Sequence, residues 1–380
     1  MKISYDLVTG SISCPALSAE QTAELQGRLS ASLLRNDPVQ TVAGQVMAAL
    51  EAAARPPEPS PPPRGPRALQ VLAGIGRPAV WQSHWRVAPW RERSRPIRVW
   101  RLLRTRSPRT FTDKVRYKML RDHRQLVVTF ADKAAVRDHV AARLGPACLP
   151  RLLALLPDPA GLREVELPDS YVVKPTHGSG AVVVVSPDAP ADARLPAPED
   201  GWGYSHVRPE MVDRERLVEV AREWSEQLYG QGPNKEWAYG QIPRQTIVEE
   251  LLVGADGGIP EDYKFFVFHQ QVRFVQVDAG RFGHRTQDFY TTAWEHLPLS
   301  GGPAWAPSPQ PRPERLDEML AMAETLGAGT DFVRVDLYAL PDRVVFGELT
   351  SYPGGGDNPF YPESFNEEFG RTWTVPRRYR

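Results

Sequence analysis

The chain has 380 residues, of which 41% are hydrophobic and 24% charged, so it can form two or three folded domains. Its 46 basic and 46 acidic residues cancel, which excludes a polycation that coats nucleic acid or anionic lipid. Two cysteines are too few for a disulfide scaffold or a Cys-type zinc site, and no apolar run approaches the roughly 20 residues that span a bilayer. We therefore expect a cytoplasmic protein.

The first 110 residues divide into three parts by composition. Residues 1–55 have no catalytic signal: they begin with a strand-like run at 3–8 and continue with an Ala/Leu/Gln stretch of helical character at 18–54. Residues 56–66 hold seven prolines in eleven positions, which predicts an extended linker. Residues 67–110 are rich in Arg and Trp, and we treat them as a separate segment.

The Arg/Trp segment allows three interpretations. Its indoles can pack on another domain while the guanidinium groups stay in water, or the mixture can bind an anionic sugar. It can also stack on bases and neutralise phosphates. The sequence leaves all three open.

Residues 111–380 have the pattern of a mixed α/β enzyme. Helical and β-rich runs alternate along this part, with no internal repeat. We expect helices over 112–122, 132–144, 210–229 and 313–326, and strands over 171–174, 181–185, 246–252, 263–268, 272–277, 332–340 and 343–350.

The strongest local signal is FVRVDLYALPDRVVFGELTSY, residues 332–352. Pro341 and Asp342 mark a turn between two β-rich runs, so we expect a hairpin. A three-residue loop at 341–343 would place Asp336 directly opposite Glu348. Alternation then predicts one core face and one polar face, the polar one formed by Arg334, Asp336, Tyr338, Phe346, Glu348 and Thr350.

Two carboxylates on opposite positions repel each other unless a cation lies between them. A hard divalent ion such as Mg²⁺, which prefers carboxylate oxygens and phosphates, would remove the conflict. The alternative is that Arg334 neutralises one acid in a surface hairpin.

A second signal is SYVVKPTHGSGAVVVV, residues 170–185. A β-rich run ends in Lys174 and is followed by the turn at 177–180 and another β-rich run. Glycines let backbone N–H groups approach a phosphate, and the lysine supplies charge. The GK[ST] tripeptide of a P-loop is absent, so the segment is either a phosphate-binding hairpin or only a turn.

A third signal is TIVEELL, residues 246–252, an apolar strand that ends in Glu249 and Glu250. Such a strand end can offer backbone groups to an adenine edge while a nearby acid accepts from ribose hydroxyls. The alternative is that both acids are merely solvated. Asp262-Tyr263-Lys264 follows shortly after.

The order of these signals resembles an ATP-grasp enzyme. More narrowly, TFADKAAVRDHV, DYKFFVF, FVRVDLY and FGELTSYPGGG resemble the TupA-like ATP-grasp family over roughly residues 111–375. The resemblance implies an α/β (α+β) ATP-grasp fold with two α+β subdomains that grip ATP. The lid subdomain would cover about 170–250 and the metal-binding subdomain about 250–375.

The resemblance also implies a role for each residue in the motifs. Lys133 and Lys174 would hold the ATP phosphates. The turn over the phosphates would be formed by His177, Gly178, Ser179 and Gly180. The adenine hinge would be formed by Glu249, Glu250 and Leu251. Asp262, or less favourably Asp256, would bind the ribose, and Lys264 would lie near the phosphates. Asp336 and Glu348 would bind Mg²⁺, and Arg334 would act as the catalytic cation.

Lysine usage adds weight to these assignments. Only seven of the 46 basic residues are lysines, and three of the seven fall at the implied nucleotide positions. Thr350 is a departure, because many ATP-grasp enzymes have Asn two residues after the metal-binding Glu. The ligands of a second metal ion are therefore left open.

The activity that the resemblance implies is an ATP-dependent carboxylate–amine ligase that works through an acyl phosphate. Its substrates would be a small or peptide acid, such as a sugar acid, and an amine in surface-glycan or natural-product synthesis. Arg281 and Arg285 are candidate carboxylate anchors, because a guanidinium matches a carboxylate, or they are surface arginines. The alternatives are a nucleotide-binding regulatory or carbohydrate-binding protein and a small-molecule kinase.

Overall fold

The computed structural model describes residues 4–5, 12–13, 103–197, 202–227, 229–230, 236–280, 285–357 and 360–379. The chain forms two units, Met1–Ala88 and Pro89–Arg380. In the first, β1 (Ser4–Tyr5) pairs with β2 (Ile12–Ser13) in antiparallel fashion. The predicted helix over 18–54, the linker at 56–66 and most of the Arg/Trp segment lie outside the described residues.

Three helices open the described part of the second unit: α6 (Phe111–Arg121), α7 (Gln125–Ala131) and α8 (Ala135–Leu144). A capping box at Thr110 and Asp113 starts α6. The sequence predicts α6 and α8 but not α7, whose β-branched Val-Val-Thr run has low helix propensity. Burial of Val127, Val128 and Phe130 outweighs that preference.

The first large sheet has the strand order β3-β7-β4-β5-β6. Its strands are β3 (Leu152–Leu156), β4 (Tyr171–Pro175), β5 (Val182–Val185), β6 (Tyr204–Val207) and β7 (Thr246–Glu250). All neighbours are antiparallel except β5 and β6, which are parallel. Helix α9 (Arg214–Glu226) packs its buried Leu217, Val218 and Trp224 into the core of this sheet.

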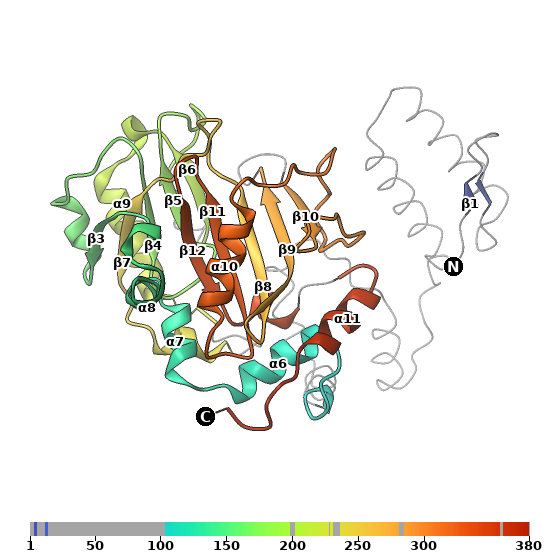
Figure 1. The fold of residues 1–380 in the computed structure, drawn as a ribbon. Coiled ribbons are helices and arrows are strands. Elements are labelled where there is room, and N and C mark those ends of the chain that lie inside the picture. The colour runs from blue at the N-terminus through green and yellow to red at the C-terminus, as the bar shows by residue number, and fades with distance from the viewer. Residues whose placement is uncertain are drawn as a thin grey trace, which may run out of the picture. The chain divides into compact units, whose positions relative to one another are not determined.

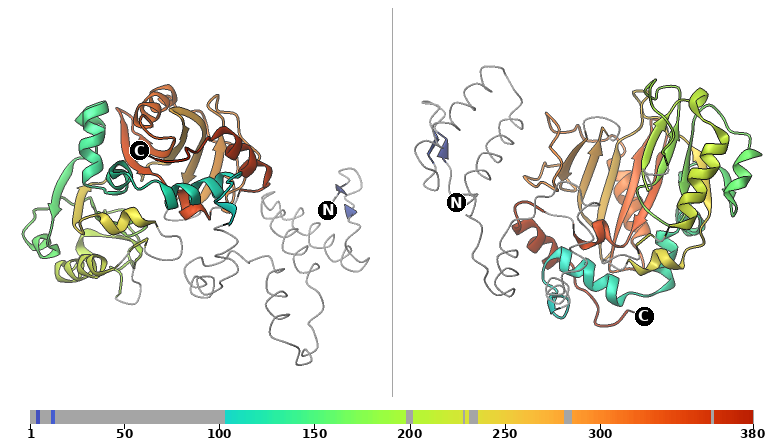
Figure 2. Two further views of the ribbon diagram at one scale, coloured as in Figure 1. Left: turned by 90° about the horizontal axis from the view of Figure 1, so that it is seen from below. Right: turned by 180° about the vertical axis from the view of Figure 1, so that it is seen from behind.

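The second large sheet is antiparallel throughout, in the order β10-β9-β8-β11-β12. Its strands are β8 (Asp262–Phe268), β9 (Gln271–Ala279), β10 (Thr286–Tyr290), β11 (Phe332–Ala339) and β12 (Val344–Thr350). Two further helices, α10 (Leu316–Leu326) and α11 (Ser364–Thr372), pack with it (Figure 1). Helix α10 shares a core cluster with one face, and α6 and α11 share another cluster with the opposite face (Figure 2).

The face of this sheet toward α6 and α11 changes character along the strands. At one end Phe266, Phe274 and Phe332 form an aromatic cluster with Phe111 of α6. Two residues further along β8 and β11, alternation places Lys264 and Arg334 on the same face. The sheet therefore has an aromatic end that helices cover and a polar end that carries charged groups.

Every strand and helix predicted beyond residue 110 forms, with shifts of a few residues at the ends. Among the described residues beyond 110, three strands and two α-helices were not predicted, namely β3, β6, β10, α7 and α11. The missed strands carry weak signals: β10 is the polar run TQDFY and β6 is YSHV. None of the described helices could cross a lipid bilayer, because none is both long and apolar enough.

The predicted hairpin of β11 and β12 forms, but its loop has four residues rather than three. Ala339 pairs with Val344, and Leu340 N donates to Arg343 O at 2.9 Å. The register then shifts between Asp336 and Leu337, because Gly347 is an extra residue on β12.

This bulge restores the predicted pairing of Asp336 with Glu348. It also corrects the predicted face of Phe346, which pairs with Leu337 and packs in the core cluster rather than on the polar face.

Candidate functional site

A cavity lies where α7 and α8 meet strands from both large sheets. Its lining includes five of the residues implied by the family motifs: Lys133, Lys174, Gly178, Glu249 and Glu348. Apolar groups, among them Phe130, Val136 and Leu349, form other parts of the wall. The fold thus brings together residues of the family motifs that are far apart in the sequence, such as Lys133 and Glu348, which are 215 positions apart.

Lys133 lies between α7 and α8, and its Nζ donates to the carbonyl oxygen of Gly178. Burial in the cavity lowers the pKa of Lys133 to about 8, and Glu348 offsets part of this effect. The ammonium of Lys133 therefore faces both the glycine turn and the carboxylate of β12. An anionic ligand in the cavity would favour its charged form.

Lys174 and Glu249 form an ion pair on the cavity wall, with Nζ 2.6 Å from Oε2. The other carboxylate oxygen of Glu249 accepts from Arg137 Nη1 at 2.5 Å, and Arg137 also donates to the carbonyl of Pro150 at 2.7 Å. Because Glu249 binds both Lys174 and Arg137, it fixes the positions of two cations that line the cavity. Arg137 was not assigned a role from the sequence, although it follows Lys133 by four positions within the motif TFADKAAVRDHV.

The glycine turn after β4 is held by close packing. Gly180 has a φ of +91°, which favours glycine. A Cβ on Gly178 would lie 2.1 Å from the indole of Trp202, so that contact also requires glycine. Trp202 Nε1 donates to the carbonyl of Ser179 at 2.7 Å. The turn therefore lies under an indole from the loop before β6.

His177 does not line the cavity. Its side chain is buried, with Nε2 3.1 Å from the carbonyl oxygen of Trp224 in α9, and burial lowers its pKa. In this arrangement the imidazole contacts α9, whose Trp224 packs in the core of the first large sheet. Gly178, rather than His177, is the turn residue at the cavity.

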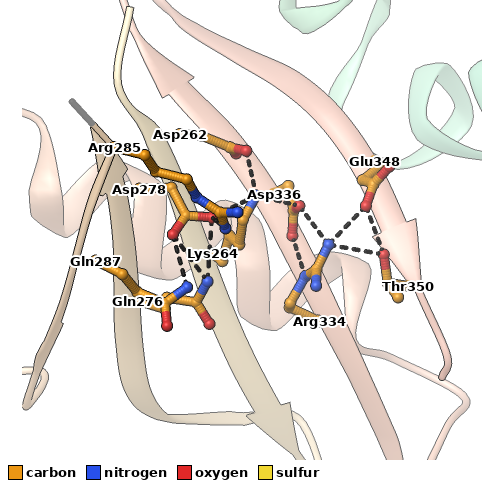
Figure 3. A network of polar contacts seen from close by, with 10 residues as sticks. All are labelled: Asp262, Lys264, Gln276, Asp278, Arg285, Gln287, Arg334, Asp336, Glu348 and Thr350. Atoms are coloured by element: carbon orange, nitrogen blue, oxygen red, sulfur yellow. Dashed lines mark hydrogen bonds and ion pairs between the residues drawn. The ribbon is translucent and has the colours of Figure 1, made fainter. Parts of the chain in front are cut away.

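Arg334 joins the two opposed carboxylates of the hairpin (Figure 3). Its guanidinium donates twice to Asp336, at 2.7 Å each, and its Nη2 donates to Glu348 at 2.6 Å. The contact foreseen in the surface-hairpin alternative is therefore present. The setting is not a surface one, because Asp336 is 2% exposed.

Lys264 lies on the neighbouring strand and pairs with three carboxylates. Its Nζ contacts Asp262, lies 2.9 Å from Asp336, and lies 3.8 Å from Asp278. Burial disfavours the ammonium, but the acids outweigh it and raise the pKa of Lys264. This lysine is therefore charged at every physiological pH.

The polar network continues onto β9 and β10. Asp278 accepts from Gln276 at 3.2 Å, from Gln287 at 2.8 Å and from Arg285 at 3.3 Å (Figure 3). None of Gln276, Asp278 and Gln287 was singled out from the sequence. Alternation could have found Gln276, since Val275 and Val277 on either side of it lie on the apolar face.

Asp336 and Glu348 share the guanidinium of Arg334, but their pKa values shift in opposite directions. Burial raises the pKa of Asp336 to about 6 despite Arg334 and Lys264. Burial also acts against the charge of Glu348, but Arg334 and Lys264 outweigh it and lower its pKa. Near neutral pH both groups are carboxylates.

The donor set fits a hard divalent ion only if phosphates complete it. Asp336 and Glu348 offer carboxylate oxygens, and Glu348, 35% exposed, also lines the cavity. In the part of the chain that the structure describes, no group of three or more His, Cys, Asp or Glu side chains is arranged to hold a metal. Mg²⁺ commonly uses one or two carboxylates plus substrate phosphates, which this pair could support.

Several predicted residues lie elsewhere. Glu250 accepts from Arg151 N at 2.8 Å and from Arg343 at 3.0 Å, so it ties the first sheet to the hairpin loop. Asp256 accepts from Gly258 N within its own loop. The residues that do not line the cavity are His177, Ser179, Gly180, Glu250, Leu251, Asp262, Lys264, Arg285, Arg334 and Asp336. Arg281 lies outside the described residues.

Similar solved structures include several ligases. One is an L-amino acid ligase from Bacillus licheniformis (15% identity, TM-score 0.35, 60% of this chain and 45% of that chain). Another is a D-alanine-D-alanine ligase from Helicobacter pylori (13%, 0.33, 65% and 62%). A third is the ATP-grasp ligase PsnB with a phosphomimetic variant of its minimal precursor, Mg and ADP (14%, 0.30, 60% and 51%).

The chain spans about half the length of the PsnB and L-amino acid ligase structures. At such TM-scores we draw no conclusion from these likenesses. The comparison with curated proteins gives no match.

The family comparison covers the second sheet and part of the site. The model described as TupA-like ATPgrasp matches residues 211–374, a range that contains β7 to β12 and α9 to α11. Lys133, Lys174 and the glycine turn lie before this range, and the cavity joins them to it. The mixed α+β architecture with two sheets agrees with the predicted ATP-grasp fold. Residues 211–374 of this chain are thus similar to the TupA-like ATP-grasp family.

Proposed function

We propose that the chain is an ATP-dependent carboxylate–amine ligase that forms an amide through an acyl phosphate. The observation that carries this proposal is the cavity where Lys133, Lys174 and Gly178 face Glu348 across the two sheets. Phosphates need cations and close backbone groups, and a metal–phosphate complex needs carboxylates beside them. Both requirements meet in one place, within a chain whose residues 211–374 match an ATP-grasp family.

The nucleotide would enter the cavity with its phosphates toward Lys133 and Lys174. Phe130, Val136 and Leu349 offer an apolar surface to the base. Lys133 now donates to Gly178, and Lys174 pairs with Glu249, so bound phosphates would replace or share these contacts. Arg137 would keep Glu249 in place when Lys174 turns toward a phosphate.

The reaction has two steps. A carboxylate oxygen of the acid attacks the γ-phosphorus of ATP, the bond from that phosphorus to the bridging oxygen breaks, and ADP leaves. The nitrogen of the amine then attacks the acyl carbon, the carbon–oxygen bond to phosphate breaks, and the amine gives up a proton. Arg334, held by Asp336, would stabilise negative charge on the transferring group.

Asp336 and Glu348 are the residues that would hold Mg²⁺. When bound, this ion screens the charge of the phosphates. Arg334 now bridges the two carboxylates, so its contact with Glu348 must loosen when the ion binds. The bidentate contact with Asp336 can persist and keep the guanidinium near the phosphoryl group.

The acid substrate has a candidate anchor in Arg285. Its guanidinium reaches Asp278 at the β9–β10 end of the polar face, and its side chain is 53% exposed. A free part of this guanidinium could bind a substrate carboxylate. We propose Arg281 as a second anchor, and we expect a sugar acid, amino acid or peptide in surface-glycan or natural-product synthesis.

Product analysis with Mg-ATP and panels of uronic acids, amino acids and amines tests the proposal. A ligase releases ADP and phosphate only when both an acid and an amine are present, and it yields an amide of the expected mass. A kinase would give ADP and a stable phosphorylated product without an amine. A binding module would release no ADP with any pair, which would contradict the proposal.

A further inference from the structure

Lys264 occupies the centre of an acidic pocket built from three strands. Asp262 is on the same strand, β8, Asp278 is on β9, and Asp336 is on β11. Among the described residues, Lys264 is the cation with ion pairs to all three acids. Figure 3 shows its side chain between these carboxylates. The ammonium thus has carboxylate oxygens on several sides, as a bound metal ion would.

The acids around Lys264 depend on this charge. All three carboxylates are nine-tenths or more buried, and so is Lys264. Arg285 pairs with Asp278 and is half exposed, while Arg334 pairs with Asp336 and also with Glu348. Lys264 is the cation that all three carboxylates share, so its loss would leave a buried acidic pocket without its central charge, an arrangement that favours uptake of another cation.

The β12 side of the site lacks a group for a second ion. Thr350 donates its hydroxyl to Glu348 at 2.8 Å and accepts from Arg334 at 3.2 Å. Its hydroxyl is therefore used within the protein. The carboxylates beyond Asp336 and Glu348 are gathered around Lys264 instead.

We propose that Lys264 is the resident cation of this three-carboxylate pocket and fills the place of a second divalent ion. The protein then takes up one divalent ion with its nucleotide, at Asp336 and Glu348. The single-ion statement rests on the proposed function, whereas the role of Lys264 as resident cation does not.

Lys264→Met tests the inference, because it removes the charge and keeps a side chain of similar length. In EDTA its Tm should fall by about 6 °C or more, the size expected for breaking a buried ion pair in a chain of this length. Mn²⁺ without nucleotide should recover most of this loss. Calorimetric titration should show one Mn²⁺ per chain in the variant and much weaker binding in the wild type.

Lys118→Met is the matched control. Lys118 is also a fully buried lysine between carboxylates, Asp122 and Asp331, but those acids have other donors. Its variant should lose stability to a similar extent in EDTA and in Mn²⁺. A second variant, Lys264→Met with Asp278→Asn, should lose the Mn²⁺ binding that the single change creates.

A Lys264→Met protein that binds Mn²⁺ no better than the wild type overturns the inference. One that stays unfolded in Mn²⁺ as well as in EDTA does the same, because the ion should replace the missing charge. Failure of the proposed ligase function appears separately, as absence of ADP release by the wild type. That failure leaves the Mn²⁺ comparison of the two proteins intact.

Discussion

Two buried lysines in this chain have similar partners and different surroundings. Lys118 of α6 lies 2.6 Å from Asp122 and 2.7 Å from Asp331. The remaining contacts of these acids come from Arg124, Thr330, Trp373 and Tyr379. Two cations, Lys118 and Arg124, balance two acids, and each carboxylate oxygen accepts at least one hydrogen bond.

The cluster around Lys264 has a different setting. Lys264, Arg285 and Arg334 pair with the four acids Asp262, Asp278, Asp336 and Glu348. One of these acids, Glu348, reaches the cavity. A cluster enclosed within the fold acts on stability alone, whereas a cluster that reaches a cavity can also contact a ligand.

The largest effect on stability should come from the balanced cluster. Lys118→Met leaves Asp122 and Asp331 without their shared cation, and loss of a buried partner costs about 3–5 kcal/mol. The melting temperature should fall while the affinity of the folded protein for Mg-ATP stays unchanged. Calorimetric melting and a nucleotide titration measure both. Weaker nucleotide binding by a folded variant would remove the contrast between the two clusters.

Glu348→Gln should lower turnover by about 10² or more and change stability by no more than about 1 kcal/mol. Glu348 is one of two candidate metal ligands, but it is 35% exposed, and Arg334 keeps its paired contact with Asp336. Removal of the repulsion between Asp336 and Glu348 would by itself make the metal-free variant more stable than the wild type. Because Arg334 already joins the acids, we expect a slight loss instead. ADP release at the wild-type rate would show that Glu348 is not a catalytic metal ligand.

Nucleotide affinity should weaken as the pH rises through about 8. Lys133 has a pKa lowered to about 8 by burial, and it must be protonated to attract phosphates. Lys133→Arg keeps the charge at high pH, so its Kd for Mg-ATP should stay flat where that of the wild type rises by up to about tenfold per pH unit. Parallel pH profiles for the two proteins would mean that Lys133 does not contact the phosphates.

The same pKa has the opposite effect on stability. The unfolded lysine keeps its ordinary value of 10.5. Between about 8 and that value, the unfolded chain therefore binds more protons than the folded one, and this group makes the protein more stable as the pH rises. Below about pH 8 the lysine is charged in both states, so it no longer makes the stability depend on pH.

The smallest effect should come from Tyr379→Phe. It removes one donor to Asp331, at 2.9 Å, while Trp373 keeps its own hydrogen bond to the same oxygen at 2.7 Å. The loss should be about 1 kcal/mol, or a Tm decrease of about 2–4 °C, with no change in nucleotide affinity. A much larger loss would show that the C-terminal residues carry more of the fold than this hydrogen bond indicates.

The polar hairpin illustrates what the sequence could predict. Alternation and the Pro-Asp turn place Asp336 opposite Glu348, and the structure has this pairing. The route to it was not predictable, because the loop is one residue longer and the bulge at Gly347 compensates. A bulge depends on packing across strands, here on Phe346 turning into the core beside Leu337, and it has no local signature beyond a glycine.

The contacts between distant segments were the least predictable part of the site. Lys133 and Lys174 stand in recognisable motifs, but the family motifs assigned no role to Arg137, which supports Glu249. Asp278 also lay one residue beyond the expected strand over 272–277, whereas β9 extends to Ala279. Such partners become visible only when the sheets and α8 are brought together in space.

A crystal structure with Mg²⁺ and a non-hydrolysable ATP analogue tests the central claim most directly. We expect the phosphates against Lys133 and Lys174, the base beside Phe130 and Leu349, and one Mg²⁺ between the phosphates and Glu348. Lys264 should remain among its carboxylates. An analogue bound elsewhere, with the cavity between the two sheets empty, would contradict the account.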